Sequence, residues 1–190
     1  MMKHPLKFIF ATILFSLALS ASAVEVKGIK VDEIAQVGGG ALVLNGVGVR
    51  TKIMLKVYVA GLYLAQKQTD ANAVINDIGN KRVSMHFLRE LSSEKLLHGL
   101  NEGFEDNNSV AEMALIDTQM KAFRQMMTST KVVKEGDVIV LDLTNAGTQV
   151  SLNGKALGNI EGAAFNQALL RVWLGGNPVD AALKKAMLGL

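Results

Sequence analysis

The sequence predicts an α+β domain in which helices cover one face of a mainly antiparallel β-sheet. Three observations support this prediction. Segments rich in Val, Ile and Tyr come first, helical periodicities fill the middle, and a β-hairpin precedes two helices at the C-terminal end. Strands grouped in this way, rather than alternating singly with helices, are typical of an antiparallel sheet with segregated helices.

Residues 1–23 have the features of a signal peptide and are set aside from the fold. Lys3 and Lys7 precede a nearly unbroken apolar segment, and the small residues Ala21-Ser22-Ala23 follow it. We predict cleavage after Ala23 and export to a bacterial periplasm, because the chain has no cysteine for disulfides or for a lipid anchor. The alternative is an uncleaved membrane anchor, but the apolar segment is shorter than the roughly 20 residues that span a bilayer.

The remaining residues, 24–190, are nearly neutral. Residues 1–23 carry two of the 20 Lys and Arg and none of the 17 Asp and Glu, which leaves 18 cations, 17 anions and a formal charge of +1. This balance lacks the basic footprint of a nucleic-acid binder, so we expect no nucleic-acid partner. The length and the absence of repeats or linkers predict one domain.

The first part of the domain predicts strands. Residues 24–37 alternate apolar and polar residues in two bursts around Gly28, which indicates a strand pair followed by a turn at Gly38-Gly39-Gly40. Further strands are expected over Leu42–Leu44, Val49–Met54 and Val57–Leu64, with a turn at Asn45-Gly46-Val47-Gly48. The apolar segment 53–65 contains Lys56 and is too short to cross a bilayer, so no membrane span is expected in the mature protein.

The middle of the chain changes to a helical period. A short helix over Thr69–Asn80 and a strand over Lys81–Arg89 precede it. Ser92 or Ser93 is expected to cap a helix, and the capping box Ser109/Glu112 to open a second helix of about five turns. The apolar stripes of these helices are Leu96, Leu97, Leu100 and Phe104, and then Met113, Ile116, Met120, Phe123 and Met127. The methionines are either core residues or an adaptable ligand wall.

The end of the chain predicts a hairpin and two helices. Strands over 137–144 and 148–152 are joined by Asn145-Ala146-Gly147. A helix over 162–174 is stopped by a glycine pair, and a last helix is expected to open with Asn177 as cap and Pro178 in its first turn.

Arg50 is the main candidate for a functional residue. It follows the glycine-containing segment and precedes an apolar strand, where a permanently charged guanidinium is costly to bury. Either Arg50 faces water beside Lys52, or an anion meets its planar fork inside the protein. Tyr58 lies on the strand face of Ala60 and Leu62, opposite Tyr63, and has either a ligand or a backbone group as hydrogen-bonding partner.

The sequence gives little support for a metal site or for nucleophilic catalysis. His86 and His98 are the only histidines after residue 23, and neither has a second ligand at metal-binding spacing. No G-x-S-x-G elbow is present, and the lack of cysteine excludes thiol catalysis and covalent haem attachment. Unattached haem held by His86 or a methionine stays open. We predict no metal and no firmly assigned catalytic residue.

The segments LNGVGVR (44–50) and KVYVAGLYL (56–64) resemble the chalcone isomerase family, whose members carry a Gly-Gly-Arg turn and then a strand ending in aliphatic-Gly-aliphatic-Tyr-Leu. The resemblance extends over FLRELSSEKLLHGLNEGF (87–104), DTQMKAFRQMM (117–127) and AAFNQALLRVWLGGNPVDAALKKAML (163–188). It favours the bacterial exported branch over the plant enzymes. It implies the family's open-faced β-sandwich, a large antiparallel sheet with a layer of helices on one face.

The resemblance also implies site residues. In the plant enzymes an arginine polarises the substrate for a ring closure without cofactor, while a threonine and a tyrosine organise water and proton transfer. Arg50 corresponds to that arginine. The threonine falls at Tyr58, the tyrosine near Ser92 and a following asparagine near Gly99, so three of four polar positions differ in chemical type. The related fatty-acid-binding branch keeps an arginine and a tyrosine that hold a carboxylate.

We therefore predict that residues 24–190 form a periplasmic chalcone isomerase-like domain that binds a lipophilic molecule with an acidic head, such as a fatty or aromatic acid, without catalysis or cofactor. Arg50 is the expected anion anchor and Tyr58 its partner, in a cleft walled by apolar helix residues. Two alternatives stay open: an intramolecular lyase that uses Arg50, and a structural or partner-binding protein without a ligand. The sequence does not specify the oligomeric state.

Overall fold

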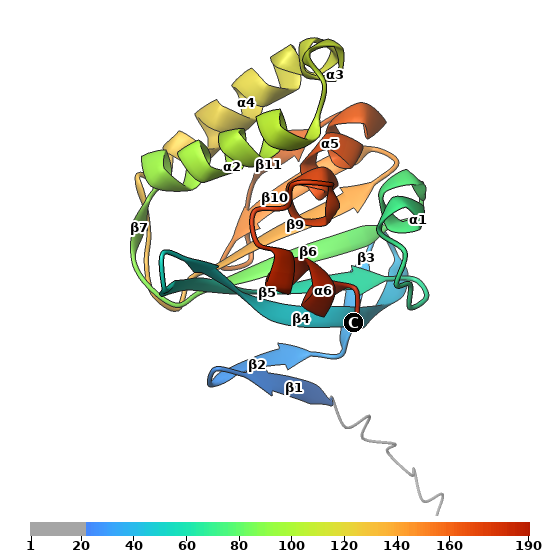
Figure 1. Ribbon diagram of the computed structural model, residues 1–190, viewed down its shortest axis with the longest axis vertical. Helices are drawn as coiled ribbons and strands as arrows, with labels where there is room; N and C mark the ends of the chain where they lie inside the picture. The colour runs from blue at the N-terminus through green and yellow to red at the C-terminus, as the bar shows by residue number, and fades with distance from the viewer. Residues whose placement is uncertain (1–21) are drawn as a thin grey trace, which may run out of the picture.

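A seven-stranded antiparallel sheet forms the framework of the protein (Figure 1). The computed structural model describes residues 22–190, so the predicted signal peptide lies almost wholly outside the described residues. The strand order is β11-β10-β9-β6-β5-β4-β3. The strands are β3 (Ile34–Val37), β4 (Gly40–Lys52), β5 (Leu55–Leu64), β6 (Lys81–Phe87), β9 (Val138–Thr144), β10 (Gly147–Leu152) and β11 (Lys155–Ile160).

Helices cover one face of the sheet, as the sequence predicts, and a two-stranded hairpin lies against the other face (Figure 1). The helices are α1 (Ala71–Asn76), α2 (Ser93–Asn107), α3 (Val110–Leu115), α4 (Asp117–Thr128), α5 (Ala163–Leu174) and α6 (Ala181–Met187). The hairpin consists of β1 (Ala23–Val26) and β2 (Ile29–Asp32), and a second short pair of β7 (Leu91–Ser92) and β8 (Val132–Val133) adjoins α2. Among residues 22–190, no helix is both long and apolar enough to cross a membrane.

Each face of the sheet has its own apolar core. The larger core lies between the sheet and the helices and includes Tyr58, Phe104, Phe123 and Trp173. The smaller core lies under the β1–β2 hairpin and includes Tyr63. The two tyrosines of β5 therefore point to opposite faces, which confirms the alternation read from the sequence.

Strand β4 corrects the predicted turn at residues 45–48. The segment is continuous strand from Gly40 to Lys52, with an irregularity in register between Leu44 and Gly46. Helix α6 crosses this part of β4 so closely that a Cβ on Gly46 would overlap the backbone oxygen of Ala186. Gly46 is therefore required by the α6 backbone, and Gly48 by the side chains of Ala186 and Leu183, rather than by a turn.

The actual turn between β4 and β5 is formed by two residues that the sequence did not mark as a turn. Ile53 and Met54 have positive φ angles, 48° and 62°, and connect Lys52 directly to Leu55. Two-residue hairpin turns with positive φ favour Asn and Gly. For an isoleucine, this backbone region costs about 1–2 kcal/mol because the Cβ approaches the following carbonyl oxygen.

Two further predictions of single elements need correction, and one strand was not predicted. The predicted five-turn helix is divided at Ile116 into α3 and α4, although the capping box at its start is present. The last helix begins at Ala181 and its cap is Asp180, whereas the predicted cap was Asn177, three residues earlier. Strand β11 was not predicted, because its sequence KALGNI has few residues with high β-propensity.

We predict that Gly46→Ala lowers the free energy of unfolding by about 1–3 kcal/mol, because the added Cβ meets the α6 backbone, which cannot yield without moving the helix. Gly176→Ala is the matched control, since Gly176 is exposed and its Cβ would meet nothing within 4 Å; we expect a change within about 0.5 kcal/mol. Urea unfolding followed by circular dichroism measures both. Equal effects of the two substitutions would contradict close packing at Gly46.

Candidate functional site

Arg50 lies near the end of β4 on the face that carries the helices. It is paired across the sheet with Tyr58 of β5, and its guanidinium carbon lies 5.5 Å from the centroid of the Tyr58 ring. The residue is only 7% exposed. The alternative in which Arg50 faces bulk water is therefore wrong, and the cation is held in a cation–π geometry on a buried aromatic ring.

The Arg50 guanidinium has no anionic partner in the described part of the chain. Its Nε is sealed from solvent and has no hydrogen-bond acceptor among residues 22–190, and none of the ion pairs found there includes it. The terminal nitrogens keep some solvent contact. By contrast, Arg82 on β6 makes two hydrogen bonds to Asp142, at 2.6 and 2.8 Å. Burying an unpaired cation is unfavourable, so Arg50 requires an explanation that Arg82 does not.

A surface cleft of about 450 Å³ opens over Arg50. We call it the Arg50 cleft. It lies between β4, α2 and the loop that joins α5 to α6. Its lining residues are Arg50, Lys52, Gly99, Glu102, Gly103, Glu105, Asp106, Asn177, Pro178 and Val179.

The walls of the Arg50 cleft are polar, which corrects the expected apolar lining. The rim carries three carboxylates, from Glu102, Glu105 and Asp106, against the two cations Arg50 and Lys52. Glu102 is paired with Lys52 at 3.3 Å on the surface. The carboxylates disfavour the approach of an anion through the rim, whereas the guanidinium at the base favours it.

Apolar walls occur instead in a neighbouring groove of about 500 Å³, which we call the hairpin groove. It runs between the β4–β5 hairpin and the start of α2. It is lined by Lys52, Ile53, Leu55, Val57, Arg89, Glu90, Leu91, Ser92 and Lys95. Lys52 lines both the groove and the Arg50 cleft, so the two hollows are adjacent along the inner side of the hairpin.

Tyr58 lies one layer deeper than Arg50. It is 1% exposed, its ring packs edge-on against Phe87, and its hydroxyl accepts a 3.0 Å hydrogen bond from Nε1 of Trp173. Burial raises the pKa of Tyr58 above its ordinary value, although the charge of Arg50 and the Trp173 hydrogen bond act in the opposite direction. The two predicted ligand residues are thus brought together, but Tyr58 supports the guanidinium from below and does not line the cleft.

The resemblance suggests two further site positions, Gly99 on α2 and Ser92 just before it, and the structure places them in different hollows. Gly99 faces Arg50, because a Cβ there would lie 3.3 Å from one terminal nitrogen of the guanidinium. Ser92 caps α2, and its Oγ accepts from the Lys95 backbone nitrogen at 3.3 Å. It lines the hairpin groove and not the Arg50 cleft. Of the three positions that correspond to the other polar residues of the plant enzymes, only Tyr58 has a polar side chain beside the guanidinium.

The histidines lie away from Arg50. His86 on β6 is half-buried on the face of the β1–β2 hairpin, where burial lowers its pKa. His98 is exposed on α2 with Glu102 3.3 Å away. Across residues 22–190, no three His, Asp or Glu side chains are grouped as metal ligands. Trp173 was missed by sequence reasoning; the one available signal was its place as the single tryptophan on a predicted amphipathic helix.

The sequence matches the profile of the chalcone isomerase-like family over residues 23–189, and the chain belongs to that family. Among solved structures it is similar to the crystal structure of a fatty-acid binding protein from Arabidopsis thaliana. The TM-score is 0.69 at 13% sequence identity, over 88% of this chain and 96% of the plant chain. This similarity shows the open-faced sandwich fold. No curated protein matches the sequence.

We predict that both tyrosines ionise only as the protein unfolds. The pKa values of Tyr58 and Tyr63 are raised mainly by burial, so the folded state holds the phenol protons more tightly than the unfolded state. Their contribution to stability is present below about pH 10 and is lost as pH rises through the folded pKa values. Phenolate absorbance and the loss of circular dichroism should rise together. Phenolate formation near pH 10 with intact secondary structure would contradict this.

We predict that Arg50→Met raises the free energy of unfolding by about 1–2 kcal/mol, because methionine keeps the apolar stem and removes a buried unpaired charge. Arg82→Met is the matched control: it breaks a charged pair and should lower stability by about 1.5–3 kcal/mol. Urea unfolding distinguishes the two. A loss of stability in Arg50→Met equal to that in Arg82→Met would show that Arg50 is a structural residue.

Proposed function

We propose that this protein is a periplasmic, non-catalytic binder of a lipophilic carboxylic acid, a fatty acid or an aromatic acid, with Arg50 as the anchor for the carboxylate. The observation that carries the proposal is the guanidinium itself. It is buried, has an unpartnered Nε and lies at the base of a surface cleft. The fold shared with a fatty-acid binding protein supports the same class of ligand.

The chemistry of the guanidinium favours a planar anion. Two parallel N–H groups of an arginine match the two oxygens of a carboxylate, and such charged hydrogen bonds are about twice as strong as neutral ones. Tyr58 fixes the plane of the guanidinium from below, and Gly99 leaves its outer side unobstructed. A carboxylate bound in the cleft would therefore satisfy the terminal N–H donors, which keep solvent contact, whereas the sealed Nε would be reached only by a group that penetrates beside Arg50.

The hairpin groove is the proposed location of the apolar tail. Ile53, Leu55, Val57 and Leu91 supply the apolar surface that the Arg50 cleft lacks. Since Lys52 is exposed and lines both hollows, we propose that a shift of this flexible side chain joins them. The head would then lie at Arg50 and the tail would extend toward the hairpin end.

Tyr58 is proposed to contribute in two ways. Its ring supports the cation, and its hydroxyl accepts from Trp173, which leaves the hydroxyl hydrogen without an acceptor among residues 22–190. A carboxylate that penetrates beside Arg50 would supply that acceptor. A phenol is protonated at neutral pH, and burial raises the pKa of Tyr58 further, so its hydroxyl can donate a hydrogen bond to an anion.

The alternative of an intramolecular lyase is less well supported by this site. General acid–base groups typically contribute about 10²–10⁴-fold to catalysis and must be within hydrogen-bond reach of the substrate. Ser92 caps a helix in the other hollow and Gly99 has no side chain, so Tyr58 is the only one of these three positions that could reach a substrate beside Arg50. A purely structural role does not explain a cation left without a counter-charge beside a hollow.

The fluorescence of Trp173 offers a direct test. It is the single tryptophan of the chain and hydrogen-bonds to the tyrosine beneath Arg50, so a ligand at Arg50 should change its emission. We expect palmitic or cinnamic acid to produce a saturable change, and Arg50→Met to weaken binding at least about tenfold, the loss corresponding to one charged hydrogen bond. Arg124→Gln, on the exposed side of α4, is the control and should bind as the wild type does.

Cetyl alcohol separates the head from the tail. An alcohol has the apolar chain without the anion, so its affinity should change little in Arg50→Met. Equal binding of acid and alcohol by the wild type, or equal binding of the acid by wild type and Arg50→Met, would contradict the anchor. Conversion of a chalcone by the wild type, lost in Arg50→Met, would favour the lyase.

A further inference from the structure

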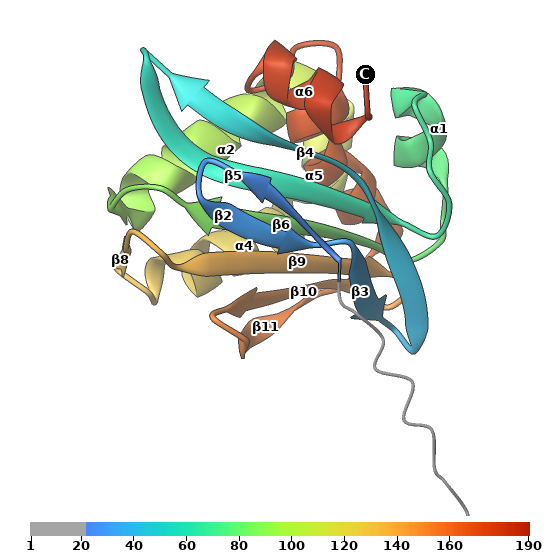
Figure 2. The same ribbon diagram turned by 90° about the horizontal axis from the view of Figure 1, so that it is seen from below.

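The tip of the β4–β5 hairpin presents large apolar side chains to solvent. Ile53 is 87% exposed and Met54 is 95% exposed, and Leu55 follows at 53%. The hairpin ends at a corner of the molecule, clear of the helices and of the β1–β2 pair (Figure 2). These three residues, which we call the apolar tip, make no contribution to either core.

The turn itself does not call for these residue types. Both positions have positive φ, for which Asn and Gly are suited and a β-branched side chain is the least suited. The isoleucine and methionine thus oppose the local backbone and are exposed to water as well. We therefore infer that these side chains contact a partner outside the described residues.

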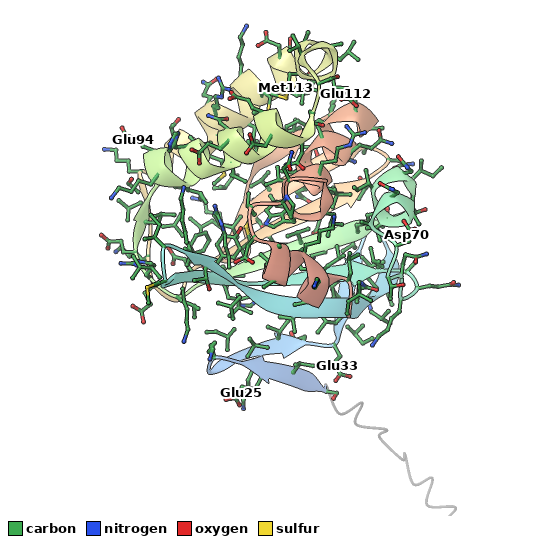
Figure 3. The ribbon with its side chains drawn as sticks, viewed as in Figure 1. Glu25, Glu33, Asp70, Glu94, Glu112 and Met113 are labelled. Carbon is green, nitrogen blue, oxygen red and sulfur yellow. The ribbon has the colours of Figure 1, made fainter. Side chains whose placement is uncertain are left out.

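Cations surround the apolar tip. Lys52 and Lys56 flank it on the two strands, and Arg89 and Lys95 lie across the hairpin groove. The nearby carboxylates belong to Glu90, in the groove lining, to Glu94, which projects from the first turn of α2 (Figure 3), and to Glu102, which is paired with Lys52. Four cations against three carboxylates leave this end of the molecule with a positive balance of one, and Lys56, Arg89 and Lys95 make no ion pair among residues 22–190.

We propose that the apolar tip inserts into the interface of a membrane that contains anionic lipids. An apolar projection with a basic border matches such an interface, because the side chains reach below the headgroups while the Lys and Arg stay among the phosphates. Insertion extends only about 5–10 Å, so the contact is peripheral and reversible. The inference rests on the tip and its charges, and does not depend on a ligand at Arg50.

A second pair of exposed apolar residues differs from the apolar tip in the charges that surround it. Val110 and Leu115 on α3 are 89% and 76% exposed, but the charges beside them are balanced, because Glu112 is paired with Arg171 and Asp117 with Lys121. A border of neutralised pairs does not attract anionic headgroups. The tip is therefore the end of the molecule that complements such a surface.

The experiment is co-sedimentation with vesicles of phosphatidylcholine alone and of phosphatidylcholine with about one third phosphatidylglycerol. Wild type and variants are isolated after export, so that all carry the same N-terminus. The test variant is Ile53→Asn/Met54→Gly, which gives the turn the residues that its backbone favours and so preserves the fold. Ile78→Asn is the control, since Ile78 is 85% exposed in another loop.

We expect the wild type and Ile78→Asn to sediment with the anionic vesicles and less with the neutral ones, with weaker binding at high salt. The tip variant should bind at least about tenfold less, since two large apolar side chains no longer leave water. No binding by the wild type, or equal binding by the tip variant, overturns the proposal. So does a wild-type dimer in analytical ultracentrifugation that the tip variant dissociates, because the occupant is then a second copy.

Discussion

The candidate site is organised around a cation that the protein buries and leaves without a counter-charge among residues 22–190. Arg50 is fixed by its pairing with Tyr58 across β4 and β5, by the face of the Tyr58 ring, and by the absence of a side chain at Gly99. Each of these holds the guanidinium in place and none neutralises it. Such an arrangement lowers stability in the ligand-free state, and under our proposal a bound carboxylate supplies the missing interaction.

The close packing of α6 on β4 positions one side of the Arg50 cleft. Gly46 and Gly48 let the helix approach the strand backbone, and Asn45 ties the end of the helix by donating to Met187. Asp180, which caps α6, also accepts from the backbone nitrogen of Thr51 at 2.8 Å. The α5–α6 loop is thereby held against the end of β4, so that residues 177–179 form one side of the Arg50 cleft.

Sequence patterns were sufficient for the fold class, for most strands and for the faces of the helices, because these depend on local alternation and periodicity. These patterns failed where a segment that is distant in sequence determines the local structure. The glycines of β4 indicated a turn, since the approach of Ala186 from the far end of the chain is invisible in the local sequence. Arg50 was found because an arginine in an apolar strand is anomalous by itself. The acidic rim was not, because Glu105 and Asp106 look like any exposed helix residues until α2 is placed over β4.

The β4–β5 hairpin links the two features that the core does not explain. Between Arg50 and Thr51 the register shifts, so that Val57 and Tyr58, although adjacent in sequence, both face the helices. Tyr58 can then support the guanidinium while Val57 lines the hairpin groove, which continues to Leu55 and Ile53 at the apolar tip. An apolar groove therefore runs from the apolar tip to Val57, beside Tyr58, and Lys52 separates this groove from the polar Arg50 cleft. A lipophilic acid that lies in a bilayer has its parts in the same order as the inserted protein, since its tail is below and its charged head is at the surface. A ligand that passed from the bilayer to Arg50 along this groove would move head first, and the groove would cover its tail as it left the lipid.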